Sequence, residues 1–319
     1  MQFEADTSVV ANAPAWDELQ RFKIFSVSGG NRLYRNGRQQ LKVRVVVAVA
    51  DASHKRVPLT QSELDSIVLV DALSGLPLSK KNRYGPEGTH VWEYMGSQDS
   101  QFRELPHYGP VPGSVPPGPF VYVVDFYVST TSDTPIKVRP RITRADGQMF
   151  QLDTGAELES LQLYSLPVAV YRTEQYSLSR TSAPYASTSG DIEKVEVFGL
   201  ELIIDQARIE FVTGFNIGTH LRIGSSDRRY TGYYLVGYGN GKYMPTGGAP
   251  RWERPDALGR RRSEGGRVAL VLAYGKHGGN VWVRDPASNT LMEFVDMYGN
   301  PHQLRVELTD DPLLVRVHR

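Results

Sequence analysis

The chain has 319 residues, no cysteine and a formal net charge of +1. This length is typical of about two domains. The lack of cysteine excludes disulfides, thiolate metal sites and cysteine catalysis, and the near-zero charge argues against a general electrostatic attraction to nucleic acid or to membranes.

The N-terminal sequence has neither the basic start nor the apolar core of a signal peptide. The longest apolar runs, residues 45–50 and 269–274, are far shorter than the ~20 residues that a membrane helix needs. We therefore expect a soluble protein without a transmembrane segment. We expect it to be made in the cytoplasm, and either to join a released particle or to be exported by another route.

Residues 1–20 are interpreted as an N-terminal arm in which Trp16 is a main apolar anchor. Tryptophan is a frequent energetic anchor at protein interfaces. We therefore expect the arm to dock on a neighbouring subunit, with Trp16 near the contact. The alternative is that Trp16 covers the end of its own domain, because terminal segments are often tied down there.

The first strong strand is Leu41–Ala50, whose odd positions are all apolar. Side chains of a strand alternate between its two faces, so one face of this strand is expected to line a core. Asn36 and Gly37 precede it and predict a hairpin turn leading into it. After it, Thr60 and Glu63 have the spacing of a capping box, which predicts a single helical turn.

Two further strands are predicted at residues 120–128 and 136–142. The second contains Pro140, and a proline inside a strand favours an edge position or a bulge. Asp146 and Gly147 then predict a hairpin. The basic residues expected on the outward face of the second strand are Lys137, Arg139 and Arg141.

Residues 177–190 are rich in small polar side chains and are interpreted as a linker between two domains. The predicted boundaries are residues 21–176 for the first domain and residues 191–319 for the second. In the second domain, the apolar positions shift from odd to even numbers across Gly199. A β-bulge at Gly199 would restore the inward face, so we predict one there.

Short strands and frequent turn signals favour an all-β fold of two antiparallel sandwich-like domains, of the immunoglobulin-like or jelly-roll-like kind, with the second domain a sandwich or a barrel. Residues 43–51, the loop after them, and Val57 with Pro58 resemble bacterial immunoglobulin-like domains of adhesins and phage particles. The resemblance implies an immunoglobulin-like sandwich for the first domain. It is an analogy of fold, which transfers no function.

The search for catalytic patterns finds none. Seven histidines are spread along the chain without a compact metal-ligand spacing, and each is interpreted as a surface or loop residue. Neither a phosphate-binding loop nor a nucleophile elbow occurs. We therefore expect no catalytic residue, no metal and no cofactor.

Two sets of residues are candidates for binding. The first set is basic and would meet an anionic partner, or would only keep a sheet edge in solvent. Its members are Lys137, Arg139, Arg141 and, in the loop at residues 251–267, Arg260, Arg261 and Arg262.

The second set is aromatic and interleaved with glycine. Exposed rings beside small residues would form a flat platform for a sugar or another protein, whereas the same rings could simply pack in a core. Its members are Tyr230, Tyr233, Tyr234, Tyr238, Tyr243 and Trp252.

Together these features favour a non-enzymatic structural or binding subunit of a larger assembly, of the phage-particle, injection-machine or adhesin type. Its expected partners are copies of itself or other subunits, because arms and edge strands join neighbours in such assemblies. A carbohydrate-binding or secreted toxin-like lectin module is the alternative, with a glycan as its ligand. A glycan-active enzyme is the third candidate, and there is no specific signal for nucleic acid.

Overall fold

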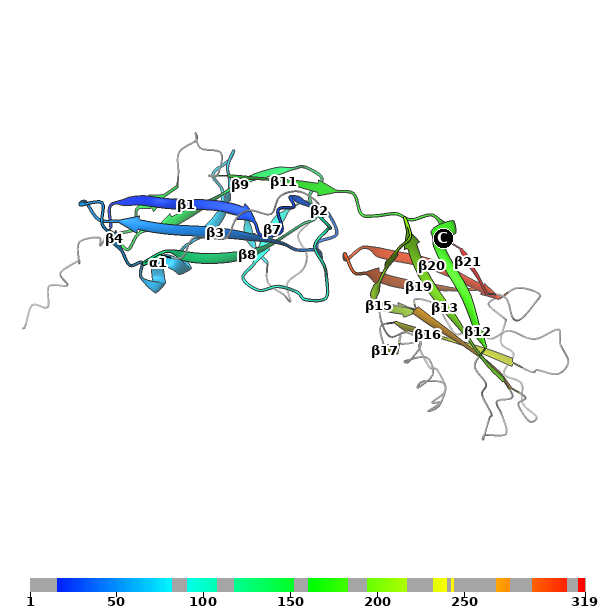
Figure 1. The fold of residues 1–319 in the computed structure, drawn as a ribbon. Coiled ribbons are helices and arrows are strands. Elements are labelled where there is room, and N and C mark those ends of the chain that lie inside the picture. Colours follow the sequence, from blue (N-terminus) through cyan, green and yellow to red (C-terminus); the bar gives the residue numbers. More distant parts are fainter. Residues whose placement is uncertain are drawn as a thin grey trace, which may run out of the picture. The chain divides into compact units, whose positions relative to one another are not determined.

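The computed structural model describes residues 16–81, 91–107, 118–151, 160–182, 194–216, 232–239, 242–243, 268–275, 289–308 and 315–318. This part of the chain is mostly strand with almost no helix, so the predicted all-β fold class is confirmed (Figure 1). The chain divides into two compact units. Unit 1 comprises Met1–Ser100 and Glu104–Pro167, and unit 2 comprises Gln101–Arg103 and Val168–Arg319.

The first sheet of unit 1 has the strand order β1-β3-β8-β7-β6, and β4 pairs with β3. All neighbours pair antiparallel except β6 and β7, which are parallel. The strands are β1 (Glu18–Ser26), β3 (Leu41–Ala50), β4 (Arg56–Val57), β6 (Ser79–Lys80), β7 (Trp92–Met95) and β8 (Tyr122–Thr130).

The second sheet of unit 1 has the order β10-β9-β11-β2, and β5 pairs with β9. Between β4 and β5 lies the short helix α1 (Gln61–Asp65), which begins with the predicted capping box at Thr60 and Glu63. The strands are β2 (Arg32–Tyr34), β5 (Val68–Asp71), β9 (Ile136–Thr143), β10 (Met149–Phe150) and β11 (Leu161–Leu166).

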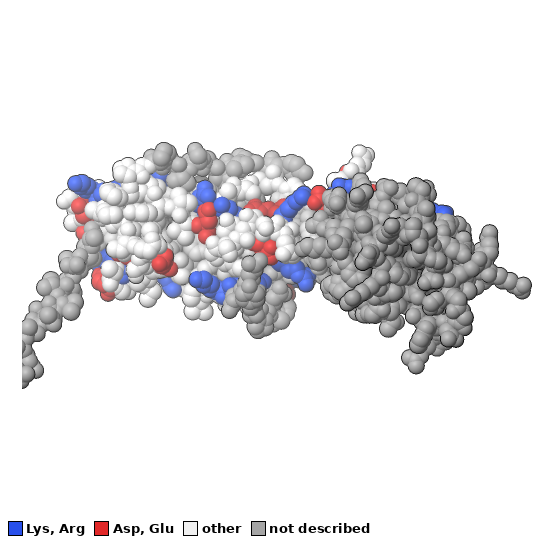
Figure 2. Space-filling model, turned by 90° about the horizontal axis from the view of Figure 1, so that it is seen from below, with Lys and Arg blue, Asp and Glu red and all other residues white. Residues whose placement is uncertain are grey.

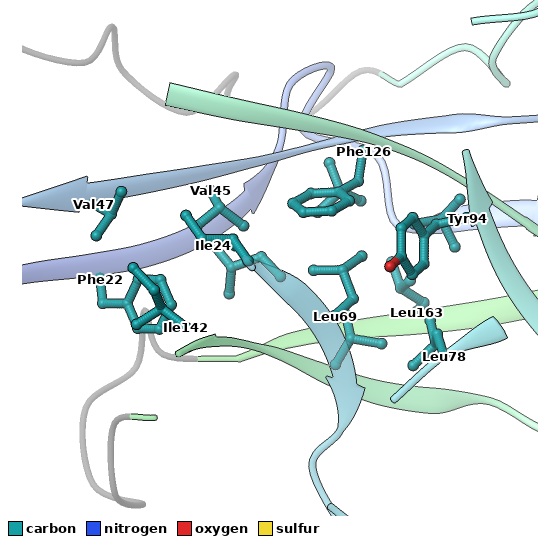
Figure 3. Close-up of a cluster of buried hydrophobic side chains, with 14 of the residues drawn as sticks. Phe22, Ile24, Val45, Val47, Leu69, Leu78, Tyr94, Phe126, Ile142 and Leu163 are labelled. Atoms are coloured by element: carbon teal, nitrogen blue, oxygen red, sulfur yellow. The ribbon is translucent and has the colours of Figure 1, made fainter. Parts of the chain in front are cut away.

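Both sheets of unit 1 contribute to one buried core (Figure 3). The odd residues of β3 lie in it as the alternation predicts, and Val43, Val45 and Val47 have no exposed surface. Leu69 of β5 and Ile142 of β9 reach the same core from the second sheet. The sandwich-like arrangement of both units stays a prediction.

Two predictions about the strands of unit 1 are corrected. Asn36 and Gly37 form a turn, with a φ of 68° at Gly37, but it does not join a hairpin. The strand before it, β2, pairs in parallel with β11, whereas β3 pairs with β1. The second correction concerns Pro140, which is buried inside β9, a strand with partners on both sides. Pro140 pairs with Leu69 of β5, and its position falls between the stretches of β9 that pair with β10 and with β11, so neither of those two pairings needs its missing N–H.

Unit 2 contains two further sheets, with the orders β12-β13-β18-β16-β17 and β15-β19-β20-β21, and β14 pairs with β13. A single 3-10 turn, η1 (Thr173–Gln175), precedes the first strand. The strands are β12 (Tyr176–Ser182), β13 (Lys194–Ile204), β14 (Ala207–Ile209), β15 (Phe211–Asn216), β16 (Gly232–Gly239), β17 (Lys242–Tyr243), β18 (Val268–Gly275), β19 (Asn289–Asp296), β20 (Pro301–Leu308) and β21 (Val315–His318).

The first part of the predicted linker is instead a strand. Residues 177–182 belong to β12, and every one of them pairs with β13. Residues 183–190 lie outside the described residues. Small polar side chains favour flexible segments only where no partner strand offers backbone hydrogen bonds, and here β13 offers a full ladder.

The predicted bulge at Gly199 is wrong. The ladder runs without interruption through β13, and Gly199 pairs with Ser179 on one side and Ala269 on the other. A Cβ atom at Gly199 would lie 3.2 Å from the Ser179 Oγ. A larger residue at this position would therefore have to displace the Ser179 hydroxyl.

Candidate functional site

The pairing of unit 2 divides the predicted tyrosines between the two faces of its first sheet. Tyr234 and Tyr238 stand four residues apart in β16, so they share one face. Tyr243 pairs directly with Tyr238, which places it on that face too. Tyr233 belongs to the other face, where it pairs with Tyr274.

The face of Tyr238 is the one opposite the core. Tyr238 pairs with Ala269, which pairs in turn with Gly199. The residues on either side of Gly199 and Ala269 in their strands point to the opposite face, and all four are buried: Phe198, Leu200, Val268 and Leu270. On the face of Gly199, by contrast, Ser177 and Ser179 are exposed, as is Ile203 at 40%. We call the face that carries Tyr234, Tyr238 and Tyr243 the tyrosine face.

The tyrosine face is uncharged over its central strands. Its positions in β16 and β18, and those of β13 that pair with β18, carry only small, aliphatic or tyrosine residues. Val195 and Val197 are two of these positions on the tyrosine face. They explain why the apolar residues of β13 change from odd to even numbers across Gly199 without a bulge. β13 carries apolar residues on both faces, first on the tyrosine face and then in the core. Trp252, Tyr230, Arg260, Arg261 and Arg262 lie outside the described residues.

The three basic residues of β9 do lie on its outward face, as predicted. Lys137 is exposed, and Arg139 and Arg141 are half-buried. The Arg141 Nη1 donates to the Gly75 carbonyl at 3.3 Å, and the Nε of Arg139 is buried without an acceptor among the described residues. Figure 2 shows basic and acidic side chains interspersed over the described part of one face, without a broad basic field.

A turn at residues 71–76 contacts β9 at Lys137 and Arg141, and no pattern of the sequence above pointed to it. It carries two highly exposed leucines, Leu73 at 95% and Leu76 at 67%. The Ala72 N–H donates to the Lys137 carbonyl at 2.7 Å, which attaches the turn to β9. The Asp-Ala-Leu-Ser-Gly sequence was the available signal, because aspartate, serine and glycine are turn formers.

Trp16 requires a correction. Its side chain has no exposed surface and belongs to the core of unit 1. The ring lies 4.6 Å from that of Phe150, and the guanidinium of Arg144 is centred 5.6 Å from it. Trp16 therefore packs on its own domain, which was the alternative to a contact with a neighbouring subunit, because burial there removes its whole ring from water.

The indole of Trp16 is held by Glu63, whose side chain is buried. The Glu63 Oε1 accepts from the Trp16 Nε1 at 2.8 Å and from the Ala145 N–H at 3.2 Å. Its Oε2 accepts from the backbone and the hydroxyl of Thr60, both at 2.9 Å. Burial by itself raises the pKa of Glu63, but these hydrogen bonds outweigh it and hold the pKa below its usual value.

Unit 2 contains a buried polar cluster that the sequence analysis also missed. His302 was interpreted as a surface or loop residue, but it lies in β20 and is only 4% exposed. Its Nε2 lies 3.1 Å from the Asp296 Oδ2, and its Nδ1 lies 2.8 Å from the Tyr176 hydroxyl. The tautomer of His302 that carries its proton on Nε2 would donate to Asp296 and accept from the Tyr176 hydroxyl at Nδ1.

The cluster is built around the β19–β20 hairpin. The Asp296 Oδ1 accepts from the N–H groups of Tyr298 and Asn300, at 2.8 and 2.9 Å. Tyr171 stacks on the His302 ring at a centroid distance of 5.4 Å. With the Asn300 Nδ2, which donates to the Oδ2 at 3.1 Å, four groups surround the Asp296 carboxylate and close the turn, so the cluster has a structural explanation.

Within the described residues, no group of three or more histidine, aspartate or glutamate side chains is placed to hold a metal ion. No helix of the described chain has the length and apolar character needed to cross a membrane.

Comparison with known proteins leaves the chain unassigned to a family. No family model matches it, and no curated protein matches it. Among solved structures, the adhesin InvE of Yersinia pseudotuberculosis aligns with 9% identity over 89% of this chain, at a TM-score of 0.20. The alignment covers 60% of that adhesin chain. A TM-score this low assigns neither a fold nor a function.

Proposed function

We propose that the protein is a non-enzymatic binding subunit of a larger assembly, of the phage-particle, injection-machine or adhesin type. The observation that carries the proposal is the tyrosine face. Tyr234, Tyr238 and Tyr243 share the face of a sheet whose opposite face is buried. Tyrosine contributes a large contact area at a small cost in rotamer entropy, which suits a surface that meets a partner.

The composition of this face also favours a partner without strong charge. The neighbouring positions in β18 are Ala269, Val271 and Ala273, which would allow a flat partner to approach the tyrosines closely. A subunit that docked here would bury apolar area, and its binding would depend little on salt.

A glycan is the second candidate ligand of the same face, and the serines of β12 favour it. Ser177 and Ser179 are exposed on the face that carries the tyrosines. Aromatic rings can stack on the apolar faces of sugars, while serine hydroxyls donate to and accept from sugar hydroxyls. In this case the protein would be a carbohydrate-binding module or a lectin.

The test compares the native protein with the triple variant Tyr234→Ala, Tyr238→Ala, Tyr243→Ala. Light scattering measures the mass of its assemblies, and a glycan array measures sugar binding. We expect the variant to lose assembly mass if the partner is protein, or array signal if it is a glycan. Its unfolding temperature should change little, since the opposite face of the sheet forms the core.

The matched control is Tyr164→Ala in β11 of unit 1, where the side chain is 44% exposed. It removes an exposed tyrosine of similar size from another sheet, so it should retain both signals. If the triple variant assembled and bound sugars as the native protein does, the tyrosine face would not be the binding surface.

A further inference from the structure

The turn at residues 71–76 presents apolar side chains to solvent in an unusual way. Leu73 is 95% exposed, the highest value among the large apolar side chains of the described residues, and Leu76 follows at 67%. Scattered surface leucines need no explanation, but two on one short turn form a local apolar projection. We call residues 71–76 the leucine turn.

The leucine turn is held rigidly by its own hydrogen bonds. The Asp71 carboxylate accepts from the Leu73 N–H at 2.9 Å and from the Ser74 hydroxyl at 2.8 Å. The Gly75 N–H donates to the Asp71 carbonyl at 2.8 Å, and the φ of 71° at Gly75 suits glycine. These hydrogen bonds order the backbone of the turn, from which the side chains of Leu73 and Leu76 extend into solvent.

Basic residues of the neighbouring strand β9 contact the base of this turn. Lys137 is bonded to it through its carbonyl, and Arg141 donates to the carbonyl of Gly75. Burial raises the pKa of Asp71, but hydrogen bonds from Leu73 and Ser74 and the nearby charge of Arg139 together hold it below its usual value. Of the three basic residues of β9, Arg139 lies near the Asp71 carboxylate and Arg141 bonds to the Gly75 carbonyl. Lys137 contacts the turn through its backbone, and its side chain is exposed.

We infer that the leucine turn docks unit 1 onto the surface of an anionic phospholipid bilayer. Leu73 and Leu76 would enter the boundary between head groups and acyl chains, while Lys137, Arg139 and Arg141 would face the lipid phosphates. Apolar insertion beside basic side chains is the combination that holds peripheral proteins at anionic membranes. The inference does not depend on the tyrosine face.

The observations favour a lipid surface over a protein pocket. Energetic anchors at protein interfaces are enriched in tryptophan, tyrosine and arginine, whereas leucine is under-represented. Two projecting leucines are also a small contact for a stable protein interface. The low net charge of the whole chain is compatible with lipid binding, since charges act over only about 10 Å at 0.1 M salt and the cations here are local.

The first test is co-sedimentation of the full chain with vesicles of phosphatidylcholine and phosphatidylglycerol, and with vesicles of phosphatidylcholine alone. We expect binding to the mixed vesicles and much weaker binding to the neutral ones. The double variant Leu73→Ser, Leu76→Ser should bind the mixed vesicles about tenfold more weakly or worse. Lys137→Glu should weaken binding and reduce its dependence on salt.

The control is Met149→Ser, because Met149 is 63% exposed in the same unit and lies in β10, outside the leucine turn. It should bind as the native protein does. All variants change exposed side chains, so their circular dichroism spectra and unfolding temperatures should match those of the native protein.

A second measurement uses the absence of native cysteine. Leu73→Cys can be labelled at a single site with a polarity-sensitive dye, and its emission should shift to the blue on mixed vesicles. The same dye on Met149→Cys should not respond.

Failure to bind the mixed vesicles, equal binding by the double variant, or a silent label at position 73 would each overturn the inference. If the double variant instead lowered the mass of the protein in light scattering without changing vesicle binding, the leucine turn would be a contact between protein subunits. That result would leave the proposed role of the tyrosine face intact.

Discussion

Glu63 shows how one buried carboxylate can connect distant parts of unit 1. Its two oxygens join the start of α1 to Trp16 and to the backbone at Ala145. The glutamate of the predicted capping box thus also binds the Trp16 indole. A buried ionised group is stable only when its hydrogen bonds are satisfied, and here each oxygen accepts two.

We expect Glu63→Gln to destabilise unit 1 by about 1–3 kcal/mol at neutral pH, because the amide nitrogen would face two donors that now meet an acceptor. The folded pKa of Glu63 is lowered from 4.5, so its contribution is fully present above about pH 4.5 and is lost as the pH falls through the folded value. The difference between native protein and variant should therefore shrink in acid. Urea unfolding from pH 7 to pH 3 measures it.

Asp65→Asn is the matched control on the same helical turn. Asp65 is exposed, and its Oδ1 accepts from Gln61, which an asparagine oxygen can also do. This variant should differ from the native protein by less than about 0.5 kcal/mol. A constant difference between Glu63→Gln and native protein across the whole pH range would contradict the role given to the carboxylate.

At the scale of elements, the β19–β20 hairpin illustrates a turn that is closed by a side chain. The chain reverses between Asp296 and Asn300, and both side chains have no exposed surface. The Asp296 Oδ2 also accepts from the Asn300 Nδ2 at 3.1 Å, beside His302. Because β20 carries His302 and β12 begins with Tyr176, the cluster connects the two sheets of unit 2.

Asp296→Asn should destabilise unit 2 by about 2–3 kcal/mol, since one acceptor oxygen becomes a donor that faces Asn300 and His302. Thermal unfolding followed by far-ultraviolet circular dichroism measures the loss of stability. Asp205→Asn, in the exposed turn between β13 and β14, is the control, because asparagine tolerates the φ of 48° at that position. Equal unfolding temperatures for both variants would show that the cluster contributes little.

At the scale of the whole molecule, the chain passes from unit 1 to unit 2 between Pro167 and Val168. Val170 is 66% exposed just beyond it. We therefore predict that a fragment of residues 1–167 folds by itself and retains one of the thermal transitions of the full chain. Calorimetry of the fragment and of the full chain measures this.

A fragment of residues 1–182 provides the control. It adds β12 without its partner β13, so it should gain no stability and should lose the added strand to limited proteolysis. If the shorter fragment failed to fold while the longer one folded well, the boundary would lie after β12, nearer the predicted linker.

Local features of this protein could be predicted because neighbouring residues determine them. The alternation of β3 specifies which of its side chains share a face, and the spacing of Thr60 and Glu63 specifies the start of α1. Asp146 and Gly147 likewise close the predicted hairpin between β9 and β10. Each pattern lies within a few residues of chain, so no distant contact was needed to recognise it.

Choices between partners required the tertiary structure. Trp16 could have contacted a neighbouring subunit or its own domain, and its contacts with Glu63, Arg144 and Phe150 show that it packs on its own domain. Residues 177–182, predicted as part of a linker, form a strand because β12 pairs with β13. Both outcomes depend on groups that are far away in the sequence, which local propensity does not contain.

The candidate site follows the same division. The sequence by itself shows tyrosines interleaved with glycine, and in a strand Tyr234 and Tyr238 share one face while Tyr233 belongs to the other. Only the pairing of β16 with β18, and of β18 with β13, puts positions 234 and 238 in register with Gly199 and position 233 in register with the buried positions of β13 and β18. A period of two separates the faces of a strand but assigns neither to the interior, because that assignment depends on which side the second sheet covers.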